Sequence, residues 1–181
     1  MEFEEIETHR LILRKITMEE FDYIYQNYSD TQLIEFLGLK SPEELAIEKK
    51  KYKGGYTIFN KKILFFQLLE KESRHNIGWC GYHTWYIDHD RAEIGYGMTQ
   101  DEFKGKGLMT EAIIPILEYG FKKMNLNRVE AFISPNNIPS LKLIDKMNFV
   151  KEGHLKQHYR NNDVIEDSLV FALLQEDFQF L

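Results

Sequence analysis

The centre of the chain holds three segments rich in aromatic and β-branched residues, separated only by short polar stretches. The segments cover residues 63–70, 78–87 and 92–98. The stretches between them, residues 71–76 and 88–90, are typical of hairpin turns. This block therefore predicts three strands that pair as antiparallel neighbours in one sheet.

The remaining segments alternate between helix and strand patterns. The clearest helix start is Ser41, a capping residue followed by Pro42 at the first helical position. We expect further strands at residues 8–14, 128–134, 149–159 and 168–174, and helices at residues 18–28, 41–54, 108–124 and 137–147. The tally predicts a mixed α+β (α/β) fold with one twisted, mostly antiparallel sheet of about seven strands flanked by about four helices.

Length and composition narrow the class of protein. A chain of 181 residues suits a single domain, which we place at residues 9–176. The single cysteine, Cys80, excludes a disulfide framework and a cysteine-based zinc site. The longest strongly apolar runs, residues 63–66 and 112–117, are too short to span a bilayer, and the acidic residues 2–5 do not resemble an export signal. The net charge of −6 is opposite to that of a typical nucleic-acid binder. We therefore expect a cytoplasmic protein with no nucleic-acid and no membrane partner.

The strongest local feature is a loop at residues 102–107 that runs into the third expected helix. Gly105 and Gly107 let successive backbone N–H groups converge on an anion. The helix start adds partial positive charge and unpaired donors, and Lys104 and Lys106 add full charges. On the residues alone, the loop suits either a diphosphate or a solvated turn that merely begins a helix.

Four blocks of the sequence, in order, resemble the acetyl-CoA-binding core of the GNAT acetyltransferase superfamily. They are residues 92–97 (AEIGYG), 104–112 (KGKGLMTEA), 137–140 (NIPS) and 148–155 (NFVKEGHL), and the strand that holds Asp167 completes the pattern. The similarity covers roughly residues 9–174 and is closest to the branch that acetylates N-terminal amines of ribosomal proteins. It implies the GNAT fold, in which the sheet is splayed between its fourth and fifth strands.

The resemblance also implies that acetyl-CoA is the co-substrate and that no metal is used. Backbone amides of residues 103–110 would hold the pyrophosphate at the helix start. The pantetheine arm would pair with the splayed edge of the strand at residues 94–98, where Gly95 and Gly97 would mark a bulge or a simple kink. The residues implied in coenzyme binding are Met98, Phe103, Lys104, Gly105, Lys106, Gly107, Leu108, Met109, Thr110, Asn137 and Ser140.

The transfer step needs a neutral amine and a stabilised leaving thiolate. A backbone N–H near Met98 would stabilise the oxyanion of the tetrahedral intermediate. Glu93, beside the expected thioester, is the first candidate for a general base, and Glu130 on the facing strand is the second. For both, a surface or salt-bridged carboxylate is the alternative. Cys80 could carry an acetyl group, although a cysteine inside a strand is more often a buried small side chain.

The sequence departs from the family pattern at three positions, one of which is Glu102, where a basic or amide residue often opens the loop. Many members place a proton-donating tyrosine where this chain has Ile144. The N-terminal-amine branch instead points to Ser140 or Asn137, both of which equally suit plain helix capping. Asn148 stands where glycine is usual, and asparagine also adopts positive φ.

The acceptor is first expected to be a protein or peptide N-terminal amine, such as that of a ribosomal protein. An α-amine has a pKa of about 8 against about 10.4 for lysine, so it is easier to deprotonate at neutral pH. The amine would attack the thioester directly in a ternary complex. The alternatives are a small-molecule amine, such as a polyamine or an aminoglycoside, and a non-catalytic acyl-CoA-binding regulatory domain. The protein is expected to be a monomer or a homodimer.

Overall fold

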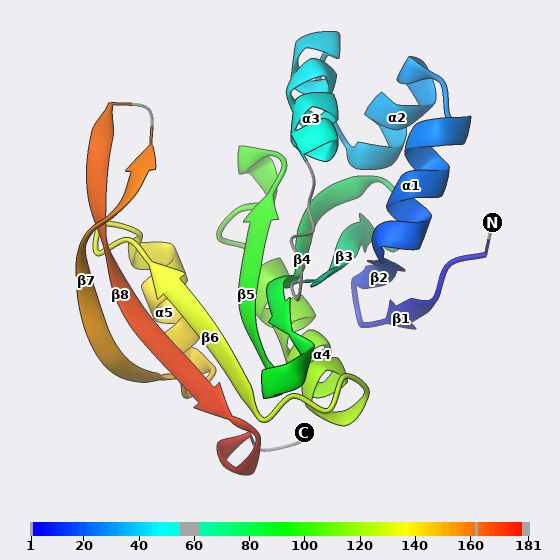
Figure 1. The fold of residues 1–181 in the computed structure, drawn as a ribbon. Helices are drawn as coiled ribbons and strands as arrows, with labels where there is room; N and C mark the ends of the chain where they lie inside the picture. The colour runs from blue at the N-terminus through cyan, green and yellow to red at the C-terminus, as the bar shows by residue number, and fades with distance from the viewer. Residues whose placement is uncertain (1, 55–61, 162, 179–181) are drawn as a thin grey trace.

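A single sheet forms the framework of the protein. The computed structural model describes residues 2–54, 62–161 and 163–178, and over these residues the sheet has eight strands in the order β1-β2-β3-β4-β5-β6-β8-β7 (Figure 1). The strands are β1 (Glu5–Glu7), β2 (Leu11–Ile16), β3 (Lys62–Glu70), β4 (Asn76–Tyr86), β5 (Arg91–Met98), β6 (Arg128–Ile133), β7 (Val150–Asn161) and β8 (Val164–Leu174). All neighbours are antiparallel except β5 and β6, which confirms the mostly antiparallel α+β fold.

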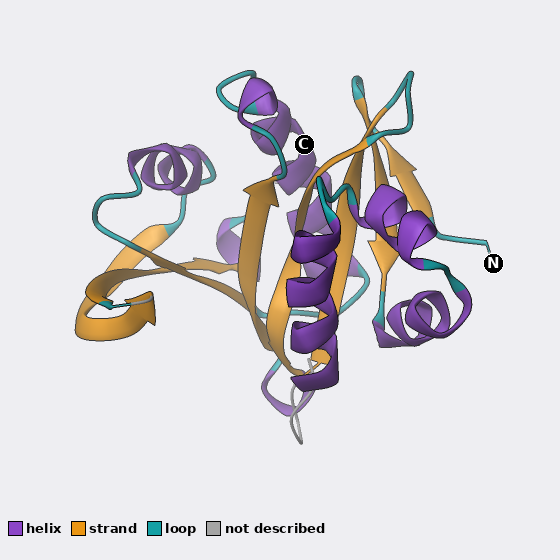
Figure 2. Ribbon diagram, turned by 90° about the horizontal axis from the view of Figure 1, so that it is seen from above, coloured by secondary structure: helices purple, strands orange, loops and turns teal. Residues whose placement is uncertain are grey.

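Helices cover both faces of this sheet (Figure 2). They are α1 (Met18–Asn27), α2 (Asp30–Leu37), α3 (Pro42–Gly54), α4 (Leu108–Lys122) and α5 (Ile138–Lys146). The described residues thus contain one helix and one strand more than expected, namely α2 and β1. No helix within the described part of the chain is long and apolar enough to cross a membrane.

Helix α2 is short, but both of its ends are well determined. The Ser29 hydroxyl accepts a hydrogen bond from the Gln32 N–H, while the Gln32 side chain accepts one from the Ser29 N–H. This reciprocal capping box satisfies two donors at the helix start. Gly38 ends the helix with φ 69°, in the left-handed region. The capping pattern is present in the sequence, but only eight helical residues lie between the two signals.

Two apolar cores hold the helices against the sheet. The larger core lies between the sheet and helices α4 and α5, and α4 contributes Leu108, Ala112, Ile113, Ile116, Leu117 and Phe121 to it. The smaller core joins Ile16 of β2 to Ile24 of α1, Leu33 of α2 and Leu45 of α3. Burial of this apolar surface fixes α4 against the sheet, and residues 99–107 join the end of β5 to the start of α4.

The sheet opens between β5 and β6. These strands are parallel and pair only from Arg91 to Glu93 on β5 and from Arg128 to Glu130 on β6. On its other side β5 stays paired with β4 as far as Met98. The two strands separate beyond the paired residues (Figure 1), which confirms the expected splay between the fourth and fifth predicted strands.

The bulge beside this opening lies on β4 and not on β5, so the expected position was wrong. Tyr82 pairs with Ile94 and Thr84 with Glu93, which leaves His83 as the extra residue. The β5 glycines have a different role. A Cβ at Gly95 would lie 2.7 Å from the His83 ring, and one at Gly97 would lie 3.2 Å from the indole of Trp79. The two glycines therefore make room for aromatic rings of β4.

Candidate active site

The glycine loop turns sharply into helix α4. It follows a short 3₁₀ turn at Asp101–Phe103. Gly105 has φ +72° and Gly107 has φ +75°, and Gly107 is the N-cap of α4. Both conformations disfavour a side chain. A Cβ at Gly105 would meet nothing within 4 Å, so the backbone there is open to a ligand. The first amides of α4 and the loop thus face an accessible space, which is the arrangement that binds phosphate groups.

That space is a cavity of about 700 Å³ between β5, the loop, α4 and α5. Ten of the eleven residues expected to bind coenzyme line it, namely Met98, Phe103, Lys104, Gly105, Gly107, Leu108, Met109, Thr110, Asn137 and Ser140. The lining also includes Tyr96 and Gly97, from the strand expected to pair with the pantetheine arm. Four further lining residues, which were not among those expected to bind coenzyme, are Pro139, Lys142, Leu143 and Lys146. The cavity therefore connects the helix start to the open edge of β5.

The cationic side chains are arranged differently from the expectation. The Lys104 ammonium pairs with Asp101 at 2.6 Å, and Lys106 lies outside the large cavity, with its ammonium 5.9 Å from the centre of the Phe103 ring. The cations from the other side of the cavity are Lys142 and Lys146 of α5. Their spacing of four residues, which places both on one helix face, is a signal that the sequence contained.

An acidic side chain in the first turn of α4 is held away from the cavity by its partners. The Glu111 carboxylate accepts hydrogen bonds from the Thr8 hydroxyl at 2.6 Å and from the Arg10 guanidinium at 2.7 Å. Burial alone would raise the pKa of the Glu111 carboxyl. The hydrogen bonds lower it by a larger amount, so the net shift is downward. Arg10 also donates to the Lys106 carbonyl at 3.0 Å. Thr8 and Arg10, which precede β2, therefore hold the glycine loop and the start of α4 in place.

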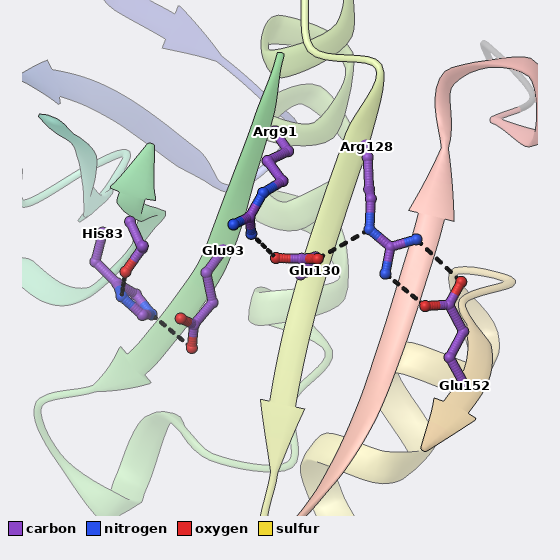
Figure 3. Close-up of polar contacts among 7 residues, drawn as sticks. His83, Arg91, Glu93, Arg128, Glu130 and Glu152 are labelled. Atoms are coloured by element: carbon purple, nitrogen blue, oxygen red, sulfur yellow. Dashed lines mark hydrogen bonds and ion pairs between the residues drawn. The ribbon is translucent and has the colours of Figure 1, made fainter. Parts of the chain in front are cut away.

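The two candidate bases lie opposite each other in the last paired position of β5 and β6 (Figure 3). Glu130 is held on both sides: Arg91 donates to one carboxylate oxygen at 2.6 Å and Arg128 to the other at 2.9 Å. Arg128 continues the network to Glu152, whose hydrogen bonds raise the pKa of the guanidinium. Glu130 is thus fixed within an ion-paired network.

Glu93 has different surroundings on the same face of the sheet. Its carboxylate lies 3.4 Å from Nε2 of His83, the bulged residue of β4 (Figure 3). Burial lowers the pKa of His83, which favours the neutral imidazole. Tyr159 approaches from β7: burial raises its pKa and the charge of Glu93 raises it further. Neither His83 nor Tyr159 was expected beside Glu93, because only the folded sheet brings these residues together.

On the opposite face, Ser140 lies in the first turn of α5. Its N–H donates to the Asn137 side chain at 3.2 Å, so Asn137 does cap the helix while it lines the cavity. The hydroxyl of Ser140 interacts with that of Tyr96 on β5. Ile144 is fully buried and apolar. Asn148 adopts φ 60°, as expected of a residue that replaces glycine.

The cysteine is placed away from any reacting group. Cys80 is fully buried in β4, and burial raises the pKa of its thiol well above the usual range. A thiol that remains protonated is a poor nucleophile. Cys80 is therefore unsuited to act as a nucleophile.

The chain is similar along most of its length to known acetyltransferases. A family model described as an acetyltransferase (GNAT) domain matches residues 10–150. The uncharacterized N-acetyltransferase p20 of Bacillus licheniformis is 31% identical over 176 residues, which cover 97% of this chain and 98% of that protein.

Solved structures share the fold. The ribosomal-protein-S5-alanine acetyltransferase of Vibrio fischeri matches with a TM-score of 0.67 and 23% identity, covering 97% of this chain and 99% of its own. The spermidine N-acetyltransferase of Vibrio cholerae, in complex with CoA and spermine, matches with a TM-score of 0.66 and 21% identity, covering 94% and 98%. The two names state different acceptors.

Proposed function

The chain belongs to the GNAT acetyltransferase family, and on that premise we propose that it transfers the acetyl group of acetyl-CoA to the N-terminal amine of a protein or peptide. The amine attacks the thioester directly while both substrates are bound. The observation that carries this proposal is the cavity of about 700 Å³ that joins the glycine loop to the open edge of β5.

The cavity supplies the groups that acetyl-CoA requires. Backbone amides around Gly105 and Gly107 suit the pyrophosphate, with Lys142 and Lys146 of α5 as further cationic partners. The amides of the pantetheine arm suit the strand edge that β6 leaves unpaired beyond Glu93. This pairing would place the thioester close to the point where β5 and β6 separate.

Glu93 is the group that we propose to take the proton of the attacking amine, directly or through water. It lies where β5 and β6 separate. The neighbouring imidazole of His83 favours its own neutral form, because burial lowers the pKa of His83. Glu130 occupies the facing position, but two guanidinium groups already bind both of its oxygens. Glu130 is therefore the weaker candidate and is assigned a structural role.

The leaving sulfur requires a donor, because the C–S bond breaks with its electron pair on sulfur. Ser140 lines the cavity from the first turn of α5 and is the proposed hydrogen-bond donor to the sulfur. Asn137 fixes the position of Ser140 by accepting a hydrogen bond from its N–H. The base and the donor thus approach the thioester from opposite faces of the sheet.

Charge favours a singly charged acceptor. Around Glu93 and Glu130, the two guanidinium groups face three carboxylates, and His83 favours its neutral form. This set therefore carries one net negative charge, which matches one amine. A polyamine carries several ammonium groups and would need more carboxylates to balance them. An α-amine, with a pKa of about 8, is also the easier amine to deprotonate at neutral pH.

The test is release of the coenzyme thiol in the presence of acetyl-CoA and a panel of amines. Peptides that begin with alanine or serine should release thiol faster than spermidine or an aminoglycoside. Gly105→Glu places a charged side chain against the pyrophosphate and should weaken coenzyme binding about 100-fold. Gly105→Ala is the matched control, since its Cβ meets no atom within 4 Å and costs only the strain of a positive φ.

Three outcomes would contradict the proposal. Thiol release with polyamines alone would move the acceptor to the small-molecule class. Coenzyme binding without release over the whole panel would favour a regulatory acyl-CoA sensor. Equal coenzyme affinity of Gly105→Glu and the wild type would remove the cavity from the coenzyme site.

A further inference from the structure

The hydroxyl group of Tyr96 contributes nothing evident to the fold and has no role in the mechanism proposed above. The Tyr96 side chain projects from β5 toward α4 and α5, packs against the larger core, and lines the large cavity. Its hydroxyl is buried and makes no regular hydrogen bond to any of the described residues. A buried hydroxyl that lacks a regular hydrogen bond is costly, and such groups in native proteins usually have a function or bind a ligand.

Tyr82 on the neighbouring strand β4 is a useful contrast. It is fully buried, and its hydroxyl donates to the Ile116 carbonyl of α4 at 2.8 Å. Two tyrosines therefore face the same core from adjacent strands. One is fully satisfied within the protein, whereas the hydroxyl of Tyr96 lies beside the cavity.

The polar group that interacts with Tyr96 is the Ser140 hydroxyl. Burial raises the pKa of Tyr96 to about 12, and the interaction with Ser140 opposes this shift in part. At neutral pH Tyr96 thus keeps its proton and acts as a hydrogen-bond donor. A thiol has a pKa of about 8.5, so complete proton transfer from Tyr96 to the leaving sulfur would be unfavourable.

We propose that Tyr96 is a positioning residue for acetyl transfer, whose O–H donates to Ser140 Oγ and directs the Ser140 O–H to the coenzyme sulfur. The C–N bond forms first and gives the tetrahedral intermediate, whose collapse breaks the C–S bond and leaves the electron pair on sulfur. The base takes the amine proton, and the thiolate takes a proton from water. Tyr96 and Ser140 keep their protons throughout and stabilise the thiolate by hydrogen bonds.

This inference rests on the proposed coenzyme site, so the first measurement uses coenzyme A alone. Coenzyme labelled at the carbon next to sulfur is bound to the protein, and NMR follows the ionisation of its thiol with pH. Hydrogen bonds to a thiolate lower its pKa. Tyr96→Phe should raise the pKa of the bound thiol by roughly 0.5–1 unit and lower kcat about tenfold, with coenzyme affinity changed less than about twofold.

Further variants test whether Tyr96 changes the pKa of the bound thiol through Ser140. Ser140→Ala should raise the thiol pKa by a similar amount, and the double variant should raise it no further, because the two hydroxyls act in series. Tyr82→Phe removes a buried hydroxyl of the same kind outside the cavity and should leave both the thiol pKa and kcat unchanged.

The outcomes separate this inference from the proposed function. If the wild type does not bind coenzyme A, the proposed function fails. If it binds, but Tyr96→Phe leaves the thiol pKa at the wild-type value, Tyr96 is a packing residue and the inference is overturned. Additive shifts in the double variant would also overturn it, since Tyr96 would then act independently of Ser140.

Discussion

Glu93 and Glu130 face each other at the last paired position between β5 and β6, and their side chains are 13% and 14% exposed. Burial and position are therefore almost the same for the two carboxylates. Their partners differ, since Glu130 binds the guanidinium groups of Arg91 and Arg128, whereas Glu93 lies beside the imidazole of His83. The two carboxylates thus differ in their partners and not in their place in the sheet.

The largest expected effect is on turnover. Glu93→Gln keeps the size and most of the polarity of the side chain but removes the proton acceptor, and it should lower kcat about 100-fold. Coenzyme affinity should stay within about twofold, since Glu93 does not line the coenzyme cavity. Steady-state kinetics with an acceptor peptide, and calorimetry with coenzyme A, measure the two quantities. A kcat equal to that of the wild type would mean that proximity alone drives the transfer.

The matching substitution on β6 should affect stability instead. Glu130→Gln removes the carboxylate that both Arg91 and Arg128 bind. It should lower the free energy of unfolding by about 1–2 kcal/mol. For a chain of this length that corresponds to a fall in Tm of roughly 3–6 °C. Thermal unfolding measures this fall, and kcat should stay within about threefold of the wild type. A loss of kcat as large as that of Glu93→Gln would reverse the assignment of the base.

The smallest effect concerns pH. Burial lowers the pKa of His83 below its usual value of 6.5, so the imidazole is neutral above that pH and gains a proton only on further acidification. Protonated His83 would pair with Glu93 as the guanidinium groups pair with Glu130. In the wild type, kcat should therefore fall as pH decreases below 6.5, and His83→Gln should remove this part of the profile. A profile that is identical in both proteins would show that His83 does not control Glu93.

The geometry of the glycine loop could be predicted because its residues are contiguous in the sequence. The loop from Phe103 to Gly107 and the start of α4 form one segment, and the positive φ values of Gly105 and Gly107 are what two glycines before a helix indicate. Helix α2 could also have been found, since Ser29 and Gln32 form a capping box in the sequence itself.

The acceptor side could not be predicted in the same way. His83 reaches Glu93 because β4 carries an extra residue at that point, and the extra residue is visible only in the register of two strands. Tyr159 approaches from β7, which is far from β5 both in the sequence and in the order of the sheet. Tyr96 belongs to a recognised block, but its role depends on the neighbouring Ser140 and on a missing hydrogen bond, neither of which a strand pattern reveals.

The early end of pairing between β5 and β6 also affects how the protein avoids self-association. An exposed strand edge normally lies at the rim of a sheet, where a second polypeptide can add to it and seed fibrils. Beyond Glu93, the unpaired edge of β5 instead lies in the interior of the sheet, between two half-sheets with helices on both faces. A second strand could reach this edge only by entering the sheet between β5 and β6, which stay joined at Glu93 and Glu130.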